Sequence, residues 1–279
     1  MSVSMTAPPR GRMGAAAAEV WRGTWVVAYR ELLRFVRERS RLVGTLLQPL
    51  LFLVVFGVGF SGIIGPLAPG VDFVQFIFPG LIAMSVLTTA LFAGVSVVWD
   101  REFGFLKEIM VAPLGRSGIV LGKAVGAAGV AVVQGLLMLV IAPFIGVSLS
   151  VGAVLAVIPV IVILAVALAG LGLILASFLR SQQGFQLLMQ IIIFPMIFLA
   201  GVFFPIGSAP AWLQVASKIN PLTYGVDALR QIFLGTGGSA ELGVELFGRV
   251  MTIGQEVALM GGLGAVLLAI AVGAFTRQE

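Results

Sequence analysis

The sequence of 279 residues contains no cysteine and no histidine, and only 10% of its residues are charged. Without cysteine the chain can form neither a disulfide framework nor a thiolate metal site, and without histidine it lacks the commonest general base and metal ligand. A soluble domain has roughly 25% charged residues. The shortage of charge therefore excludes an ordinary soluble protein, and the absence of both side chains leaves few enzyme mechanisms open.

Apolar residues are abundant instead: 59% of the residues are hydrophobic and the mean hydropathy is +1.13. About 20 apolar residues cross the ~30 Å hydrocarbon core of a bilayer. The sequence therefore predicts an all-α polytopic membrane protein with six transmembrane helices. Their approximate ranges are 42–64, 73–98, 124–148, 152–178, 186–204 and 256–275.

Basic residues are distributed unevenly among the connections between these spans. Fourteen lie on one set of connections, eight of them before residue 42, whereas the alternate set holds three, namely Lys218, Arg230 and Arg249. Basic connections stay in the cytoplasm. We therefore expect a multi-pass protein of the plasma (inner) membrane with both termini cytoplasmic. The net charge of +5 then reflects topology, and we expect no nucleic-acid partner.

The segment before the first span has two parts. Residues 1–18 predict a disordered tail. From 19 to 41 apolar and basic residues alternate at helical spacing, which is typical of an amphipathic helix that lies in the cytoplasmic interface and contacts membrane lipid. Residues 42–279 then form the transmembrane domain. The aromatic face of the interfacial helix holds Trp21, Trp25 and Tyr29, and the basic face holds Arg30 and Arg34.

A charged interruption, WDREFGFLKEIMVAPLGRSGIVLGK, separates the second and third spans at residues 99–123, and seven of its residues are charged. From about Glu102 to Ala112 apolar residues recur at helical spacing, and Pro113 then stops the helix. This pattern predicts a short amphipathic helix across the cytoplasmic ends of the spans. An ordinary cytoplasmic loop is the alternative.

The end of this interruption, GRSGIVLGK, is not a nucleotide-binding loop. Gly118 and Gly122 enclose three residues rather than four, and Ala124 stands where Ser or Thr would coordinate magnesium. Gly118, Gly122 and Gly126 instead form a ridge of small residues that favours close packing of helices.

Polar residues in or beside the spans have structural interpretations. Gln134, like the other glutamines there, is expected to hydrogen-bond between helices rather than to contact a substrate. No acid lies in the middle of a span, and Glu256, at the edge of the sixth, is expected to face solvent.

A long external segment at 205–255 precedes the sixth span. Ser208 is expected to cap a first short helix that continues to Ile219, and Asn220-Pro221 breaks it. The stretch LTYGVDALRQIF predicts a second helix. Neither piece can span a membrane, so short re-entrant or surface helices are predicted.

Two motifs in the expected order resemble those of a known family. They are FPGLIAMSV, followed by the charged interruption, and INPLTYGVDALRQIF. The chain resembles, from about residue 20 onward, the membrane subunits of type-2 ABC exporters, most of all the daunorubicin-resistance-like permeases. The resemblance implies a transport subunit that is not an enzyme and binds no cofactor itself. Two copies of a separate ABC ATP-binding subunit would bind ATP and Mg, and a second permease chain would complete a homodimer.

The resemblance also implies that the charged interruption is a coupling helix received by a groove on the ATPase. Apolar residues of the helix would fill the groove, and charged residues would fix its orientation. The residues assigned to this helix are Arg101, Glu102, Phe103, Gly104, Leu106, Glu108, Met110 and Pro113.

Phenylalanines recur four residues apart on the first and fifth spans, as Phe52 and Phe56 and as Phe194 and Phe198. They are candidates for the lining of an apolar translocation path between two chains, with core packing as the alternative.

The function predicted from the sequence is ATP-driven export of a small amphipathic or drug-like compound by alternating access, as in multidrug export and antibiotic resistance. A lipid- or polysaccharide-type substrate is the alternative within this class. A secondary carrier is a further alternative, disfavoured because no carboxylate lies in the middle of a span.

Overall fold

The computed structural model describes residues 11–60, 71–102, 116–147, 149–239, 245–246 and 249–277. Almost all of them are helical, so the all-α class is confirmed. The α-helices are α1 (Gly11–Arg37), α2 (Arg39–Phe52), α4 (Phe73–Leu91), α5 (Val95–Glu102), α7 (Arg116–Ile141), α8 (Val151–Phe178), α9 (Gln182–Leu199), α10 (Ala211–Ile219), α11 (Pro221–Ser239) and α12 (Ile253–Arg277). A π-helix, η1 (Leu53–Val58), and short 3₁₀ helices, η2 (Phe92–Gly94), η3 (Ala142–Ile145) and η4 (Ile206–Ser208), adjoin them. Strands β1 (Glu245–Leu246) and β2 (Arg249–Val250) pair antiparallel.

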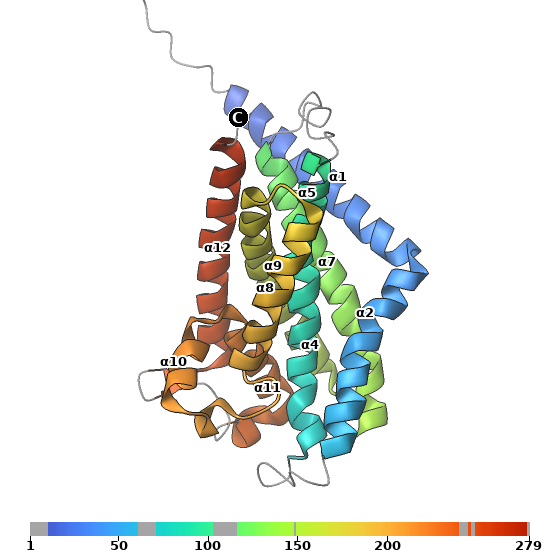
Figure 1. Ribbon diagram of the computed structural model, residues 1–279, viewed down its shortest axis with the longest axis vertical. Helices are drawn as coiled ribbons and strands as arrows, with labels where there is room; N and C mark the ends of the chain where they lie inside the picture. The colour runs from blue at the N-terminus through green and yellow to red at the C-terminus, as the bar shows by residue number, and fades with distance from the viewer. Residues whose placement is uncertain are drawn as a thin grey trace, which may run out of the picture.

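Most of the long helices run along one axis of the molecule (Figure 1). The start of α1 and the end of α12 lie at the same end of the bundle, whereas α10 and α11 lie at the opposite end. An even number of membrane crossings brings both ends of a chain to one side. The arrangement therefore agrees with the predicted number of spans.

Five helical segments of the described residues are long and apolar enough to cross a membrane: Phe73–Trp99, Ser117–Ile145, Val151–Phe178, Gln182–Leu199 and Ile253–Phe275. A sixth is available if α1 and α2, which are bent by 72° against each other, are taken as one broken span. Three predicted spans have corrected boundaries. The third is Ser117–Ile145 rather than 124–148, the fifth is Gln182–Leu199 rather than 186–204, and the sixth begins at Ile253 rather than 256. Each helix begins earlier than predicted because it continues through polar residues.

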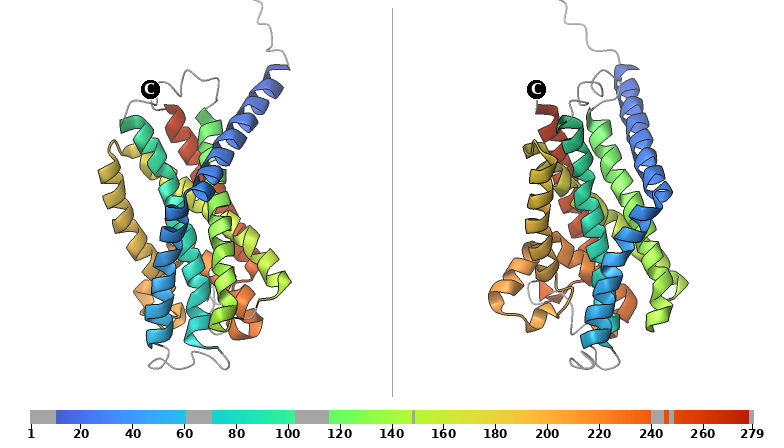
Figure 2. Two further views of the ribbon diagram at one scale, coloured as in Figure 1. Left: turned by 90° about the vertical axis from the view of Figure 1, so that its right-hand side faces the viewer. Right: turned by 45° about the vertical axis from the view of Figure 1, so that its right-hand side comes forward.

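Helix α1 begins inside the segment that the sequence predicts as disordered, and it packs along α7 (Figure 2). The predicted ridge of small residues is the contact surface. A Cβ on Gly118 would lie 3.0 Å from the carbonyl oxygen of Val20, and one on Gly122 would lie 2.7 Å from the Cβ of Val27. The ridge therefore admits the backbone of α1, and the GRSGIVLGK stretch is helical from Arg116 onward rather than a loop around phosphate.

Helix α4 belongs to the span Phe73–Trp99, which is the most enclosed of the candidate spans in the described residues. In this span 67% of an 18-residue apolar stretch is buried. Gln134 on α7 holds it to its neighbours: its side-chain amide donates to the backbone oxygen of Thr45 on α2 at 3.1 Å and accepts from the hydroxyl of Thr89 on α4. The expectation that Gln134 forms interhelical hydrogen bonds is confirmed.

The two predicted short helices before the last span differ in their surroundings. Helix α10 is peripheral, and Trp212 on it is 68% exposed. Helix α11 has an unbroken run of buried residues from Leu222 to Gln231, so it is enclosed by the bundle rather than lying on its surface. The predicted cap is wrong: Pro210 occupies the N-cap position of α10, and the Ser208 hydroxyl donates to the Pro205 oxygen instead.

Asn220 forms the break between α10 and α11, as predicted. Its side-chain oxygen accepts from the backbone N–H of Leu222 at 3.1 Å, which satisfies a free donor at the start of α11. Its side-chain nitrogen donates to the backbone oxygen of Met196 on α9 at 2.7 Å. A single amide therefore fixes the start of α11 against a span.

A buried charged cluster joins α11 to the start of α12, and it overturns the expectation that Glu256 faces solvent. Glu256 is fully buried, and its carboxylate accepts from the side-chain nitrogen of Gln231 at 3.2 Å. Arg230 donates to the Gly201 carbonyl oxygen at 2.9 Å. Asp227 is buried beside them and adds a second carboxyl group. The fold encloses the acid because α11 enters the bundle, which apolar periodicity alone does not reveal.

Candidate functional site

The candidate coupling region is described only at its beginning. Arg101 and Glu102 form the last turn of α5. The other residues assigned to the coupling helix lie outside the described residues, namely Phe103, Gly104, Leu106, Glu108, Met110 and Pro113. Their role stays a prediction.

Arg101 caps the end of α8. Its guanidinium donates to the backbone oxygen of Ser177 at 2.9 Å and to that of Leu179 at 3.1 Å. The last carbonyl groups of a helix have no partner within it, and a cation there also complements the helix dipole. Burial, and next the positive charge of Arg180, lower the pKa of Arg101 below its usual value. Arg101 therefore holds α5 to the C-terminus of α8.

Glu102 makes the complementary contact at the start of α9. Its carboxylate accepts from the backbone N–H of Gln182 at 2.8 Å, next to Ser181, whose hydroxyl caps the same helix by accepting from Gly184. An anion at a helix N-terminus is favoured by the dipole and by the free N–H groups. Two consecutive residues of opposite charge thus bind the two sides of the α8–α9 turn, a function within the chain that the sequence did not reveal.

We expect Arg101→Met to loosen this turn without unfolding the protein. The substitution removes two charge-assisted hydrogen bonds at a half-exposed position, so the loss of stability should be modest, about 1 kcal/mol. Hydrogen–deuterium exchange measured by mass spectrometry should show faster exchange in peptides covering residues 179–186. Arg22→Met on the exposed side of α1 is the matched control and should leave that segment unchanged. Unaltered exchange in Arg101→Met would mean that the contact does not hold the turn.

The four phenylalanines of the candidate path belong to one continuous aromatic row. The rings of Phe52 and Phe56 stack at 5.6 Å, and those of Phe194 and Phe198 lie 5.2 Å apart. Phe203, in the connection after α9, joins the pairs, with its ring 4.8 Å from Phe56 and 5.7 Å from Phe198. Phe203 could not be predicted from the sequence, because Phe203 lies outside the four-residue helical spacing that identified the other phenylalanines.

Part of this row faces outward. Phe194 is 63% exposed and Phe198 is 40% exposed, whereas Phe52 and Phe56 are half-buried. The first pair is therefore partly enclosed within one chain, whereas the second pair is more exposed than core packing within one chain requires.

The residues predicted for the interfacial helix lie in two environments. Trp21, Trp25 and Tyr29 are all more than half exposed along α1. Arg30 and Arg34 border a cavity together with Lys123 on α7. In the sequence Lys123 is the last residue of the charged interruption. Its position next to Gly122, on the ridge that contacts α1, is the signal that could have placed it at this cavity.

The described residues contain no group of three or more His, Cys, Asp or Glu side chains able to hold a metal ion. The features they do contain are buried helix–helix contacts, an enclosed short helix, α11, and an exposed aromatic face. With the candidate spans, they define a membrane-embedded, multi-pass helical protein.

Comparison with known proteins gives the family. The model of the ABC-2 type transporter family matches residues 22–234. The chain is 30% identical to Nodulation protein J of Rhizobium leguminosarum bv. trifolii over 83% of this chain and 86% of that protein. It is 27% identical to the putative transport permease ycf38 of Porphyra purpurea, over 83% and 81% respectively. It is 34% identical to the probable multidrug ABC transporter permease YbhR of Escherichia coli, over 60% of this chain and 45% of that protein.

The chain therefore belongs to the ABC-2 type transporter family and is a permease subunit of an ABC transporter. The resemblance inferred from FPGLIAMSV, the charged interruption and INPLTYGVDALRQIF is confirmed. These motifs lie within the matched region, at residues 78–123 and 219–233.

Proposed function

We propose that this permease exports a small amphipathic, drug-like compound from the cytoplasm, as a homodimer driven by two copies of a separate ATP-binding subunit. The observation that carries the proposal is the exposed aromatic face on α9 of a chain that belongs to a transporter family. ATP and Mg are then bound by the partner subunit. A relative named as a probable multidrug permease supports the drug-like class. A lipid- or polysaccharide-type substrate is the alternative.

The pairing of two chains is supported by polar residues on the same face. Helix α9 stands at the edge of the bundle (Figure 2), and only 22% of its 18-residue apolar stretch is buried inside the protein. Gln190 on α9 and Gln48 on α2 are exposed within spans, where an amide facing lipid is unfavourable. A second copy that covers this face would give both amides partners and would enclose the aromatic row as a path.

The proposed orientation places the end that carries both termini in the cytoplasm of the inner membrane. Three features support it: the distribution of basic residues, the common position of the two ends in the fold, and the row of Trp21, Trp25 and Tyr29 at that end, where aromatic residues favour the membrane interface.

The rival is a secondary carrier, and one observation bears on it. Asp227 and Glu256 are acids buried in the protein at the outer end of α12, and carriers use such groups. Here, however, the buried Arg230 interacts electrostatically with both acids, and Gln231 donates a hydrogen bond to Glu256, which favours a structural role. Transport that depends on ATP hydrolysis and not on an ion gradient separates the two functions.

The decisive experiment tests docking of the ATP-binding subunit to the predicted coupling helix. We expect Leu106→Asp and Glu108→Lys to insert normally but to lose the ATP-binding subunit on co-purification, because a charge is placed in an apolar groove or reversed at its rim. Loss of one buried charge partner typically costs about 2–5 kcal/mol of binding, which would abolish most complex at working concentrations.

Lys218→Glu at the opposite end of the bundle, an exposed charge reversal, is the control and should keep the partner. Substrate-stimulated ATPase activity in reconstituted vesicles gives a second measurement. If both coupling variants retain the ATP-binding subunit and transport at the wild-type rate, the coupling assignment is wrong.

A further inference from the structure

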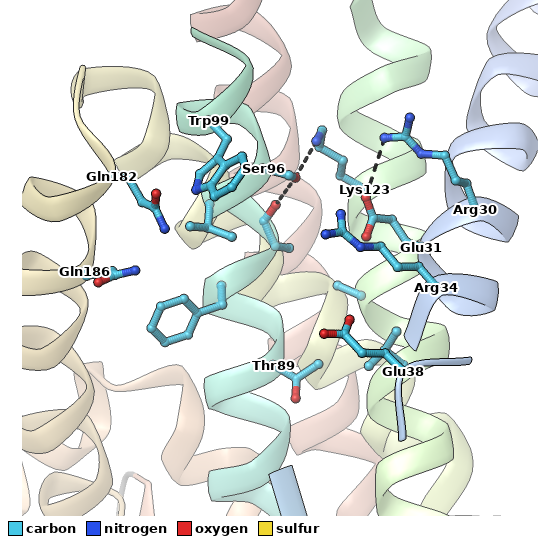
Figure 3. Close-up of a pocket in the computed structure, with 15 residues that line it drawn as sticks. Arg30, Glu31, Arg34, Glu38, Thr89, Ser96, Trp99, Lys123, Gln182 and Gln186 are labelled. Carbon is cyan, nitrogen blue, oxygen red and sulfur yellow. Dashed lines mark hydrogen bonds and ion pairs between the residues drawn. The ribbon is translucent and has the colours of Figure 1, made fainter. Parts of the chain in front are cut away.

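A cavity of about 430 Å³ lies between α1 and α9, with α5 and α7 behind it (Figure 3). It lies toward the end of the bundle that carries both termini, because it borders Gln182 at the start of α9 and Trp99 near the end of α5. It is separate from the aromatic row of Phe52 to Phe198, none of which lines it.

Cations outnumber carboxylates around this cavity. Arg30 and Arg34 of α1 and Lys123 of α7 face Glu31 and Glu38. Arg30 pairs with Glu31 at 3.9 Å. The remaining three charges leave one positive charge in excess, in a region next to apolar spans.

Lys123 is the part of this site that is fixed by the fold. It is only 4% exposed, and its amine donates to the hydroxyl of Ser96 on α5. The close approach of α1 at Gly122, its neighbour, encloses it. Charges that are held away from bulk water interact more strongly with each other, because the dielectric constant around them is lower. An anion that enters the cavity would therefore gain more from Lys123 than it would from a lysine in water.

The remaining walls have a different character. Phe92, Trp99 and Val130 contribute apolar surface, while Gln182 and Gln186 of α9 present amides from the opposite side (Figure 3). Helix α1 forms the other wall and exposes Trp21, Trp25 and Tyr29, residue types that favour the membrane interface, so the cavity adjoins the lipid at this end of the bundle. A ligand that fits both parts has an anionic head and an apolar body.

We propose that this cavity binds the phosphate headgroup of an anionic amphiphile from the adjoining membrane leaflet. Lys123 and Arg34 hold the phosphate, because lysine and arginine donate charge-assisted hydrogen bonds to it. The amides of Gln182 and Gln186 bind polar atoms next to the phosphate, and the acyl chain leaves past Phe92 and Trp99. This inference goes beyond the proposed function, since binding requires neither the ATP-binding subunit nor export.

The test uses the purified full-length chain in a neutral detergent, without the ATP-binding subunit. Trp99 is the reporter once Trp21, Trp25 and Trp212, all largely exposed, are replaced by Phe. Titration with dihexanoyl phosphatidic acid should change Trp99 fluorescence in a saturable way. Two compounds serve as comparisons: dihexanoyl phosphatidylcholine, which lacks net charge, and inorganic phosphate, which lacks the apolar body. Each should bind at least about tenfold more weakly than phosphatidic acid.

Two variants identify the site. Lys123→Met, and separately Arg34→Gln, should each weaken binding of phosphatidic acid by about tenfold or more. Arg34 is exposed, so Arg34→Gln should fold normally and keeps the test informative if Lys123→Met is destabilised. Arg22→Gln, on the same helix but outside the cavity, is the matched control and should bind as the parent does.

Four results would overturn the proposal. Equal affinity for phosphatidylcholine would show that the cavity does not select an anion. Equal affinity for inorganic phosphate would show that it is a free-phosphate site without recognition of an amphiphile. Normal binding by Arg34→Gln, or equal weakening by Arg22→Gln, would place the binding elsewhere. None of these results bears on docking at Leu106 and Glu108, so the proposed export function stands or falls independently.

Discussion

Arg230→Met is expected to be the most destabilising single change considered for this protein. The Arg230 guanidinium is fully buried, lies 3.9 Å from the centroid of the Phe76 ring and donates to the Gly201 oxygen. Its removal leaves the carboxyl groups of Asp227 and Glu256 enclosed without their cation. Removing one partner from a buried ion pair lowers the free energy of unfolding by on the order of 3–5 kcal/mol.

The measurement is the apparent unfolding temperature of the full-length chain in detergent, together with its yield in the membrane. Lys218→Met is the control, because Lys218 is exposed and its loss should change stability by no more than about 0.5 kcal/mol. Adding Asp227→Asn to Arg230→Met should recover part of the loss, since one buried acid is then neutral. An Arg230→Met protein as stable as the wild type would show that the cluster contributes nothing to the fold.

Gly172→Val is expected to disrupt the crossing of α4 and α8. A Cβ on Gly172 would overlap the carbonyl oxygen of Leu91, and one on Gly94 would lie 2.5 Å from the carbonyl oxygen of Gly172. Both obstacles are backbone atoms, which cannot rotate away as a side chain can. Overpacking of a buried contact typically costs about 1–3 kcal/mol, and a rigid contact lies at the upper end of that range.

Gly262→Ala on α12 provides the control for this second change, because no atom lies within 4 Å of the position of an added Cβ. Alanine should be neutral there or stabilise the helix by up to about 1 kcal/mol. The same unfolding measurement applies. A Gly172→Val chain that unfolds at the temperature of the wild type would show that α4 and α8 do not approach each other as closely as described.

Most of the span positions could be predicted because membrane crossing is a local requirement. A run of apolar residues long enough for the bilayer is visible without any knowledge of packing. The span predicted at 73–98 is observed as Phe73–Trp99, and that at 152–178 as Val151–Phe178. The ridge of Gly118, Gly122 and Gly126 was recognised for the same reason, since close approach leaves a local pattern of small residues.

The functional contacts could not be predicted in the same way. Arg101 and Glu102 looked like docking charges, yet their hydrogen bonds run to α8 and α9, some 80 residues along the chain. The sequence pattern assigns no contact to Lys123, and it predicts that Glu256 faces solvent, whereas both are buried. In each case the partner comes from a distant part of the chain, and no periodicity encodes it.

By itself the sequence determined the class of protein, the all-α architecture and most of the spans, because hydrophobicity and helical spacing act over one element at a time. Only the tertiary structure decided which charges are enclosed. Burial of Lys123, Arg230 and Glu256 depends on where α1, α11 and α12 pack. Whether a buried charge stabilises or destabilises the protein depends on the groups around it and not on the residue type alone.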